Sequence, residues 1–334
     1  MKTYDVYGIG NALVDTEYKV DESFLNFAQL QKGLMTLIEE DERQQLINLL
    51  EDENKYQAIR QSGGGSAANS MVIVSQLGGS AFYSCKVAND RAGDFFVNDL
   101  IAAGIDTNLT DSREMGATGQ CISMVTPDAE RTMATCLGIT NFLSPSDLDP
   151  DALRASSNLY IEGYLVSSVT GFEAALSAQA IAKSASVEVS ITLSDPAIVK
   201  NFLSHFERML GFGVDLLFCN LDEARLLTQK DSIKDCARSL QDICPKFVIT
   251  CGKDGSFAFD GSELIHVKGV PTEAIDTTGA GDIFAGAFLY SLTQGTSFRT
   301  AAELANRFAS LLVARFGARL EEKDIRQAFK NNKN

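Results

Sequence analysis

Histidine is almost absent from this sequence of 334 residues, which contains only His205 and His266. A zinc site built on histidine ligands is therefore not expected. The seven cysteines include no Cys-x-x-Cys pair, and their odd number is typical of free thiols in a reducing compartment. The first residues lack the basic and then apolar pattern of a signal peptide, and no apolar run reaches the length of a membrane helix. We therefore expect a cytoplasmic protein.

Positive charge is also scarce. The chain has 29 lysines and arginines against 44 aspartates and glutamates, which gives a net charge of −15. This balance argues against nucleic acid or an anionic membrane as a partner, because both are polyanions. A small-molecule substrate is expected instead, and an anionic one would need positive groups placed locally.

Two common signatures of phosphate-handling enzymes are missing. The chain contains no Gly-x-x-x-x-Gly-Lys-Ser/Thr sequence, so it is not a P-loop enzyme. It also lacks the kinase signature with a catalytic His-Arg-Asp. Any phosphoryl chemistry must therefore use a different arrangement of residues.

One stretch offers such an arrangement: Asp276-Thr277-Thr278-Gly279-Ala280-Gly281-Asp282, followed by an apolar, helix-like run. Backbone N–H groups at a helix N-terminus lack partners and attract anions, and glycines allow close approach. Gly279, Ala280 and Gly281 can therefore cradle a phosphoryl group, while Asp282 can take the proton of an attacking hydroxyl. A tight turn with an ordinary helix cap is the alternative. The two acids, two threonines and two glycines together favour phosphoryl transfer.

A second glycine-rich segment runs from Ser62 to Asn69 and leads into another expected helix. It fits the dinucleotide-binding fingerprint loosely, but the strand before it is weak and no clear ribose-binding acid follows. We therefore expect it to pack closely against a polyhydroxylated ligand. Asn69 offers that ligand both a donor and an acceptor.

Strands and helices alternate over most of the chain, which indicates a mostly parallel sheet with helices on both faces. With an apolar content of 45%, a single domain over residues 1–334 can bury a large core. Polar residues recur where strands end, at the sheet edge where such folds bind ligands. These are Asp15, Tyr164, Asp195, Asn220, Thr250 and Asp276.

A β-hairpin interrupts this alternation. Residues 118–125 and 131–135 alternate with a period of two and flank a turn. We interpret the hairpin as part of a small β-lid formed by about residues 11–38 and 113–141. Arg131 lies just after the turn, where it is either a solvated charge or a clamp on a transferred phosphoryl group. Asn220 and Glu223 can hold hydrated Mg²⁺ through oxygen ligands.

These motifs resemble those of the ribokinase-like (phosphofructokinase-B) family of carbohydrate and nucleoside kinases. The likeness covers the Asp276–Asp282 string, the Gly64–Asn69 glycine motif and the Asn220-x-x-Glu223 magnesium motif, in the family's order. It implies a three-layer α/β/α sandwich with a mostly parallel sheet. Within the family, Gly10–Asp15 and Ile161–Leu165 are most similar to segments of adenosine kinases.

The resemblance also implies ligands and roles. ATP and Mg²⁺ would be the cofactors, and a monovalent cation such as K⁺ would bind at Asp276. Asp282 would deprotonate the 5′-hydroxyl group of a nucleoside, and Arg131 would lie near the transferred phosphate. The acceptor would be bound by Asn11, Asp15, Gly64, Gly65, Ser66, Asn69 and Tyr164. The nucleotide would be lined by Asn220, Thr250, Gly252, Gly255 and Asn306. Separately from the resemblance, we expect a monomer or a homodimer.

Three functions are compatible with these residues. The first is an ATP-dependent nucleoside kinase that prefers adenosine. The second is a sugar kinase of the same family, which would keep the chemistry without a pocket for the base. The third is a non-catalytic sensor, which the intact Gly281 and Asp282 disfavour. The Ser194-Asp195-Pro196 segment matches the family only loosely, so no ligand is assigned to it.

Overall fold

The computed structural model describes residues 2–52, 55–109, 113–128 and 130–330. Its centre is a nine-stranded sheet in the order β14-β13-β12-β11-β10-β9-β1-β5-β6. The pairs from β6 to β12 are parallel, and β13 and β14 add an antiparallel edge. The strands are β1 (Tyr4–Ile9), β5 (Ala81–Ser84), β6 (Ile105–Asp106), β9 (Ser156–Ile161), β10 (Glu188–Thr192), β11 (Leu216–Asn220), β12 (Phe247–Thr250), β13 (Ser256–Phe259) and β14 (Leu264–Val267).

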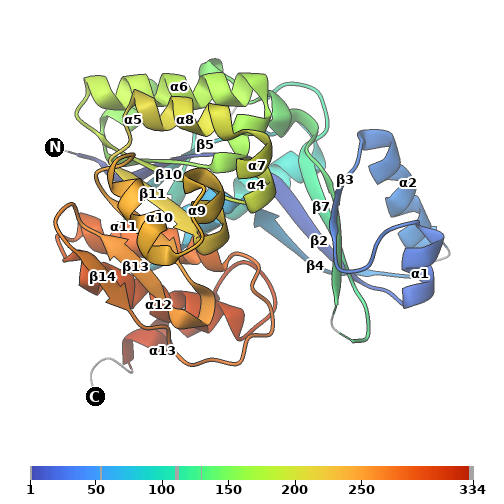
Figure 1. Cartoon of the computed structure of the whole chain (residues 1–334). Helices are drawn as coiled ribbons and strands as arrows, with labels where there is room; N and C mark the ends of the chain where they lie inside the picture. Colours follow the sequence, from blue (N-terminus) through green and yellow to red (C-terminus); the bar gives the residue numbers. More distant parts are fainter. Residues whose placement is uncertain (1, 53–54, 110–112, 129, 331–334) are drawn as a thin grey trace.

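Successive residues of the central strands belong to two different cores, as expected for strands that are buried on both faces. Phe218 packs with α3, α4, α11, α12 and α13, whereas its neighbour Leu217 packs with α5, α6, α8, α9 and α10. Figure 1 shows the two helical layers on either side of the sheet. The helices are α3 (Ser66–Gln76), α4 (Arg91–Ala102), α5 (Pro150–Arg154), α6 (Val169–Ser184), α7 (Pro196–Asn201), α8 (Leu203–Phe212), α9 (Leu221–Thr228), α10 (Ile233–Gln241), α11 (Ala280–Thr293), α12 (Phe298–Val313) and α13 (Glu322–Lys330).

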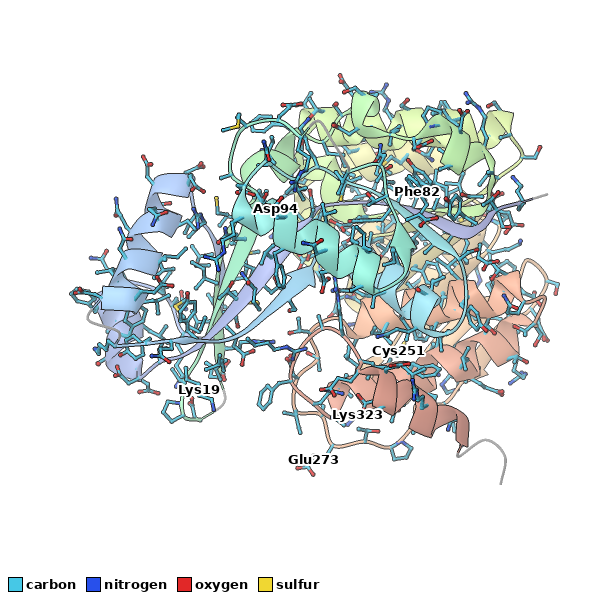
Figure 2. The ribbon with its side chains drawn as sticks, turned by 180° about the vertical axis from the view of Figure 1, so that it is seen from behind. Lys19, Phe82, Asp94, Cys251, Glu273 and Lys323 are labelled. Atoms are coloured by element: carbon cyan, nitrogen blue, oxygen red, sulfur yellow. The ribbon has the colours of Figure 1, made fainter. Side chains whose placement is uncertain are left out.

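A second sheet of five strands forms a lid beside this body, in the order β3-β8-β7-β2-β4 (Figure 1). Two helices cover it and share a separate hydrophobic core with it, which includes Tyr18, Leu46 and Met124. Viewed from behind, α4, labelled at Asp94, lies where the lid strands meet the body (Figure 2). The lid elements are β2 (Leu13–Lys19), α1 (Glu22–Phe27), β3 (Met35–Leu37), α2 (Glu40–Glu51), β4 (Ala58–Gly64), β7 (Gly119–Val125) and β8 (Arg131–Cys136).

The largely parallel central sheet with helices on both faces agrees with the expected α/β fold class, and two local expectations need correction. Asp15 lies on the lid strand β2 rather than at the edge of the central sheet, because Val14, Tyr18 and Val20 alternate with polar residues as in a half-buried strand. The lid also includes α2 and β4, which lie outside the expected ranges. Between α7 and α8, Phe202 leaves helical geometry and so separates the two helices.

The described residues contain no candidate membrane-spanning helix, because none of their helices combines the length and the apolar character needed to cross a bilayer.

Candidate active site

A large cleft lies between the lid and the body, and its volume is about 1530 Å³. A single small ligand usually occupies a pocket of roughly 300–1,000 Å³, so this cleft has room for two. It brings together most of the residues expected from the sequence. These are Asn11, Asp15, Gly65, Ser66, Asn69, Tyr164, Asn220, Glu223, Thr250, Gly279, Ala280, Gly281 and Asp282.

The N-terminus of α11 opens into the cleft without a side-chain cap. Gly279 precedes it with φ +77°, a left-handed conformation that suits glycine, and a Cβ there would lie 2.8 Å from the carbonyl oxygen of Ala318. The Ala280 N–H group already donates to the Thr277 carbonyl at 3.2 Å, so it is a weaker candidate donor than expected. Gly281 is exposed, and a Cβ on it would meet no atom within 4 Å. An anion can therefore approach this end of the helix.

The N-terminus of α3 faces the same cleft and also lacks a side-chain cap. Gly65 begins it with φ +103°, and a Cβ there would lie 2.2 Å from the backbone oxygen of Asn11. The two helices pack closely because Gly286 on α11 faces Ser70 on α3, where a Cβ would lie 2.3 Å from the Ser70 carbonyl oxygen. Two positive helix ends are thus held side by side at the cleft.

Asp282 lies in the first turn of α11 and joins these two helix ends. Its carboxylate accepts hydrogen bonds from Ser66 Oγ at 2.6 Å and from Asn69 Nδ2 at 2.9 Å. Burial raises the pKa of Asp282 to about 6, despite these donors and the nearby Arg319. The group is thus mainly ionised at neutral pH, yet its pKa is close enough to neutrality for it to accept a proton in catalysis.

Asp15 faces the cleft from β2, and its carboxylate accepts no hydrogen bond from any residue that the structure describes. Burial raises its pKa to about 6, while Arg319, Arg131 and Arg60 act in the opposite direction. Gly64 does not line the cleft itself. It leaves room for this carboxylate, because a Cβ at Gly64 would lie 2.5 Å from Asp15 Oδ2.

Asn11 is held in place by Glu162, to which the sequence reading gave no role. Glu162 follows β9, is 1% exposed, and accepts from Asn11 Nδ2 at 3.0 Å and from the Ala67 N–H group at 2.9 Å. Burial raises its pKa to about 7. The same pattern applies to Asn69, whose amide bonds both Asp282 and Arg319. Both asparagines expected to bind substrate are thus already engaged with charged side chains.

Arg131 lies in a separate small pocket of about 40 Å³ that adjoins Asp15. Its guanidinium pairs with Asp276 at 2.7 Å and with Glu17 at 2.5 Å. Burial acts to raise the pKa of Asp276, but hydrogen bonds from Gly317 and Thr278, together with Arg131, lower it. The cation that faces Asp276 in the structure is therefore Arg131, and binding of K⁺ at Asp276 stays a prediction without further support.

Asn220 and Glu223 form a capping box at the start of α9. Glu223 accepts at 2.8 Å from both the N–H group and the side-chain amide of Asn220. Burial raises the pKa of Glu223 to about 7. Among the described residues no group of three or more metal-binding side chains occurs. The pair therefore does not form an all-protein cage, but its remaining oxygen lone pairs suit a hydrated Mg²⁺ held through water.

Tyr164 lies in a 3₁₀ turn, Gly163–Ser167, and lines the cleft, and its ring stacks on no described aromatic residue. Exposed apolar side chains also line this cleft. We call Met35, Leu37, Met115 and Phe142 the apolar rim; the first two come from the lid. Backbone hydrogen bonds hold the segments that carry the rim. Strand β3, which carries Met35 and Leu37, pairs with β8. The segments of Met115 and Phe142 are joined where Ile139 N–H donates to the Ala117 carbonyl at 2.8 Å.

Three residues expected to contact the nucleotide do not line the cleft. Gly252 is an exposed turn residue. Gly255 has φ +91°, and a Cβ there would lie 2.1 Å from the Val267 carbonyl oxygen, so its role in the structure is conformational. Asn306 is buried and donates to the Val267 carbonyl at 3.2 Å. Thr250, which was also expected to contact the nucleotide, does line the cleft.

The cleft is acidic. No lysine or arginine occurs among the described residues that line it, whereas eight carboxylates do. Anion binding must therefore depend on the helix ends, a metal ion and the neighbouring arginines. The carboxylates are Asp15, Glu39, Glu40, Glu114, Glu162, Asp195, Glu223 and Asp282.

Two site residues were missed at the sequence level. Glu162 could have been recognised as an acid that directly follows a buried strand at the ligand-binding edge. Arg319 lies after α12, far in sequence from any motif, and only the fold brings it to Asn69. The nearby Gly317 N–H group donates to Asp276 at 3.0 Å, so the segment after α12 helps to hold the loop that begins at Asp276.

Comparison with known proteins places this geometry in context. Residues 34–325 match the pfkB family carbohydrate kinase model. A ribokinase from Staphylococcus aureus is 28% identical over 270 residues, which cover 78% of this chain and 85% of the relative. A probable sugar kinase from Rhizobium etli superimposes with a TM-score of 0.88 at 32% identity, over 99% of both chains. An adenosine kinase from Sinorhizobium meliloti gives a TM-score of 0.87 at 33% identity, over 98% of this chain and 99% of the other. With the match covering most of its length, the chain belongs to the pfkB family of carbohydrate kinases and is an enzyme of that family.

Proposed function

We propose that the protein transfers the γ-phosphoryl group of ATP to the hydroxymethyl group of a nucleoside, with adenosine as the preferred acceptor and AMP as its product. The observation that carries the proposal is the position of Asp282 between two uncapped helix ends that face one cleft. A base beside an anion-binding helix terminus is the arrangement that phosphoryl transfer to an alcohol needs.

In this proposal Asp282 takes the proton of the attacking hydroxyl group as the bond to the γ-phosphorus forms, while the bond from that phosphorus to the bridging oxygen breaks and ADP leaves. The N-terminus of α11 stabilises the negative charge of the transferred group, and Gly281 leaves space for it. Asp15 accepts hydrogen bonds from the vicinal hydroxyl groups of the ribose. Its free carboxylate on β2 supports that role, since a diol can satisfy both oxygens.

The nucleotide would lie toward Asn220 and Thr250 on the body side of the cleft. Bound Mg²⁺ would supply positive charge that neutralises the phosphates of the nucleotide. Asn220 and Glu223 would hold the hydrated ion through water. Arg131 would add a positive charge from the lid, which the acidic lining of the cleft makes necessary.

The preference for a nucleoside over a free sugar is supported by the apolar rim and Tyr164. These side chains present apolar surface that a sugar alone would leave exposed, whereas a purine base can cover it.

A direct assay tests the proposal. Wild-type protein is incubated with radiolabelled ATP and Mg²⁺ and with adenosine, inosine, ribose or fructose, and kcat/KM is compared. We expect adenosine to give the highest value. A higher value for either sugar would refute the nucleoside preference. Binding of adenosine without turnover of any acceptor would instead indicate a sensor.

Replacing Tyr164 with alanine is expected to raise KM for adenosine by about 3- to 10-fold, because one stacking surface worth roughly 0.5–1.5 kcal/mol is lost. The effect on ribose, if ribose is turned over, should be smaller. Tyr164→Phe keeps the ring and serves as the matched control. Equal losses for the nucleoside and the sugar would show that Tyr164 does not contact the base.

A further inference from the structure

The segment between α12 and α13 forms part of the site although it contains no recognised motif. Gly317 donates to Asp276, and Ala318 lines the cleft against Gly279. Arg319 comes next, with a side chain that is 11% exposed. The chemistry proposed above assigns no role to this buried cation.

Arg319 connects three elements. Its Nε donates to Asn69 Oδ1 on α3 at 2.8 Å, and its Nη1 pairs with Asp99 on α4. Its Nη2 lies beside Gly63 on the lid strand β4, where a Cβ would approach it to 3.1 Å. A Cβ at Gly63 would come even closer to Asp99 Oδ2, at 2.2 Å, so the glycine leaves room for the Asp99–Arg319 ion pair at the point where the lid strand enters the body.

The bond to Asn69 determines how that amide is oriented. A guanidinium group can only donate hydrogen bonds, so it must face the amide oxygen. The amide nitrogen is then directed to Asp282, where it donates at 2.9 Å. A reversed amide would place its oxygen against the carboxylate and its nitrogen against the guanidinium, and both contacts would be repulsive.

Charge leads to the same conclusion. Asp282 faces Ser66 and Asn69 on α3, and the carboxylates of Asp15 on β2 and Glu162 after β9 are close enough to interact with it. Among the charged groups around Asp282, Arg319 is the cation that lowers the pKa of this carboxylate. The tyrosine hydroxyls that interact with the carboxylate are those of Tyr83, Tyr160 and Tyr164.

We infer that Arg319 is a positioning residue for Asp282: through Asn69 it fixes the orientation of the carboxylate, and it places a positive charge on the other side of that amide. The role of Asp282 as the base rests on the proposed function, but the Arg319–Asn69–Asp282 relay does not. The relay can therefore be tested with and without turnover.

Two variants separate orientation from charge. Arg319→Gln can keep a donor near the position of Nε but removes the charge, while Arg319→Met removes both. Arg315→Met is the matched control, because Arg315 belongs to the same segment and pairs with Glu321 and Asp324 instead. Thermal unfolding shows whether each variant is folded. If Arg319→Met does not fold, the test uses Arg319→Gln alone.

The first readout needs no substrate. In protein labelled with ¹⁵N-asparagine, the side-chain amide signals of Asn69, identified by their loss in Asn69→Ala, follow the protonation of Asp282. We expect a titration midpoint near 6 in the wild type and in Arg315→Met. In both Arg319 variants the midpoint should be higher by at least about half a pH unit. An unchanged midpoint in the Arg319 variants would overturn the inference.

The second readout is kinetic. At pH 7, Arg319→Met should lower kcat by about 10- to 10²-fold, with a smaller change in KM for the acceptor, because the base is misplaced. The double variant with Asn69→Ala should be no slower than Asn69→Ala alone by more than about 2-fold. Additive losses would show that Arg319 does not act through Asn69. A wild type without turnover would refute the proposed function and leave the titration as the test of the relay.

Discussion

Replacement of Asp282 with asparagine is expected to lower kcat by about 10²–10⁴-fold, which is the usual contribution of a general base. Asparagine has the same shape and can keep both contacts, since its oxygen can accept from Asn69 and its nitrogen can donate to Ser66 Oγ. Affinity for the acceptor should therefore change far less than turnover. The measurement is kcat and KM for the acceptor at pH 7.5, with the variant compared to wild type.

The same variant should also be more stable than the wild type at neutral pH. The pKa of Asp282 is raised from 3.8 to about 6, so the folded protein holds this proton more tightly than the unfolded chain does. The resulting cost to folding is absent at low pH and increases as the pH rises from about 4 to about 6. Asparagine at position 282 has no carboxyl group to ionise and so avoids this cost. Above pH 6 the free energy of unfolding of Asp282→Asn should therefore exceed that of the wild type by roughly 1–3 kcal/mol.

Asp195→Asn is the matched control for this pair of effects. Asp195 lines the same cleft and caps α7, and asparagine is an equally good cap. Its turnover should stay within a few-fold of the wild type. Near-normal turnover of Asp282→Asn would remove Asp282 as the base, whatever its stability.

Arg131→Met is expected to have the second largest effect, a loss of about 10²-fold or more in kcat with a smaller change in KM for the acceptor. Among the described ion pairs, Arg131 is the cation that joins a lid strand, through Glu17, to the loop of Asp276. Because no lysine or arginine lines the described cleft, the transferred group has few other sources of positive charge.

Arg60→Met provides the control for this prediction. Arg60 faces the same small pocket from β4, and its side chain donates to the Phe316 carbonyl at 3.3 Å rather than to a carboxylate. It should lose much less turnover. If Arg131→Met changed KM alone, Arg131 would contribute to binding and not to the transition state.

The fold was largely predictable because its signals are local. Buried strands such as Leu216–Asn220 appear as apolar runs that end in polar residues, and their alternation with helices indicates a parallel sheet. The lid was harder to delimit. The β4 segment, Ala58–Gly64, is mostly exposed and ends in glycines, so neither its composition nor its burial pattern resembles a typical strand. Its pairing with β2 is a long-range contact that a local pattern does not contain.

The candidate site shows the same division. Gly279, Gly281 and Asp282 form one turn, so their spacing alone indicates their chemistry. Arg319 and Glu162 reach the site only through tertiary structure, and their significance depends on what they contact. The capping box of Asn220 and Glu223 is seen only in the structure, because the same spacing serves a capping box and a metal motif equally well.

The lid has a hydrophobic core of its own, which has a thermodynamic consequence. Tyr18, Leu46 and Met124 remain packed with one another wherever the lid lies relative to the body. A rearrangement of the lid would therefore hydrate little additional apolar surface and would have only a small heat-capacity signature. Its free energy would be determined mainly by polar contacts such as the Arg131–Asp276 pair, and hence by ionic strength and by the charge of whatever occupies the cleft.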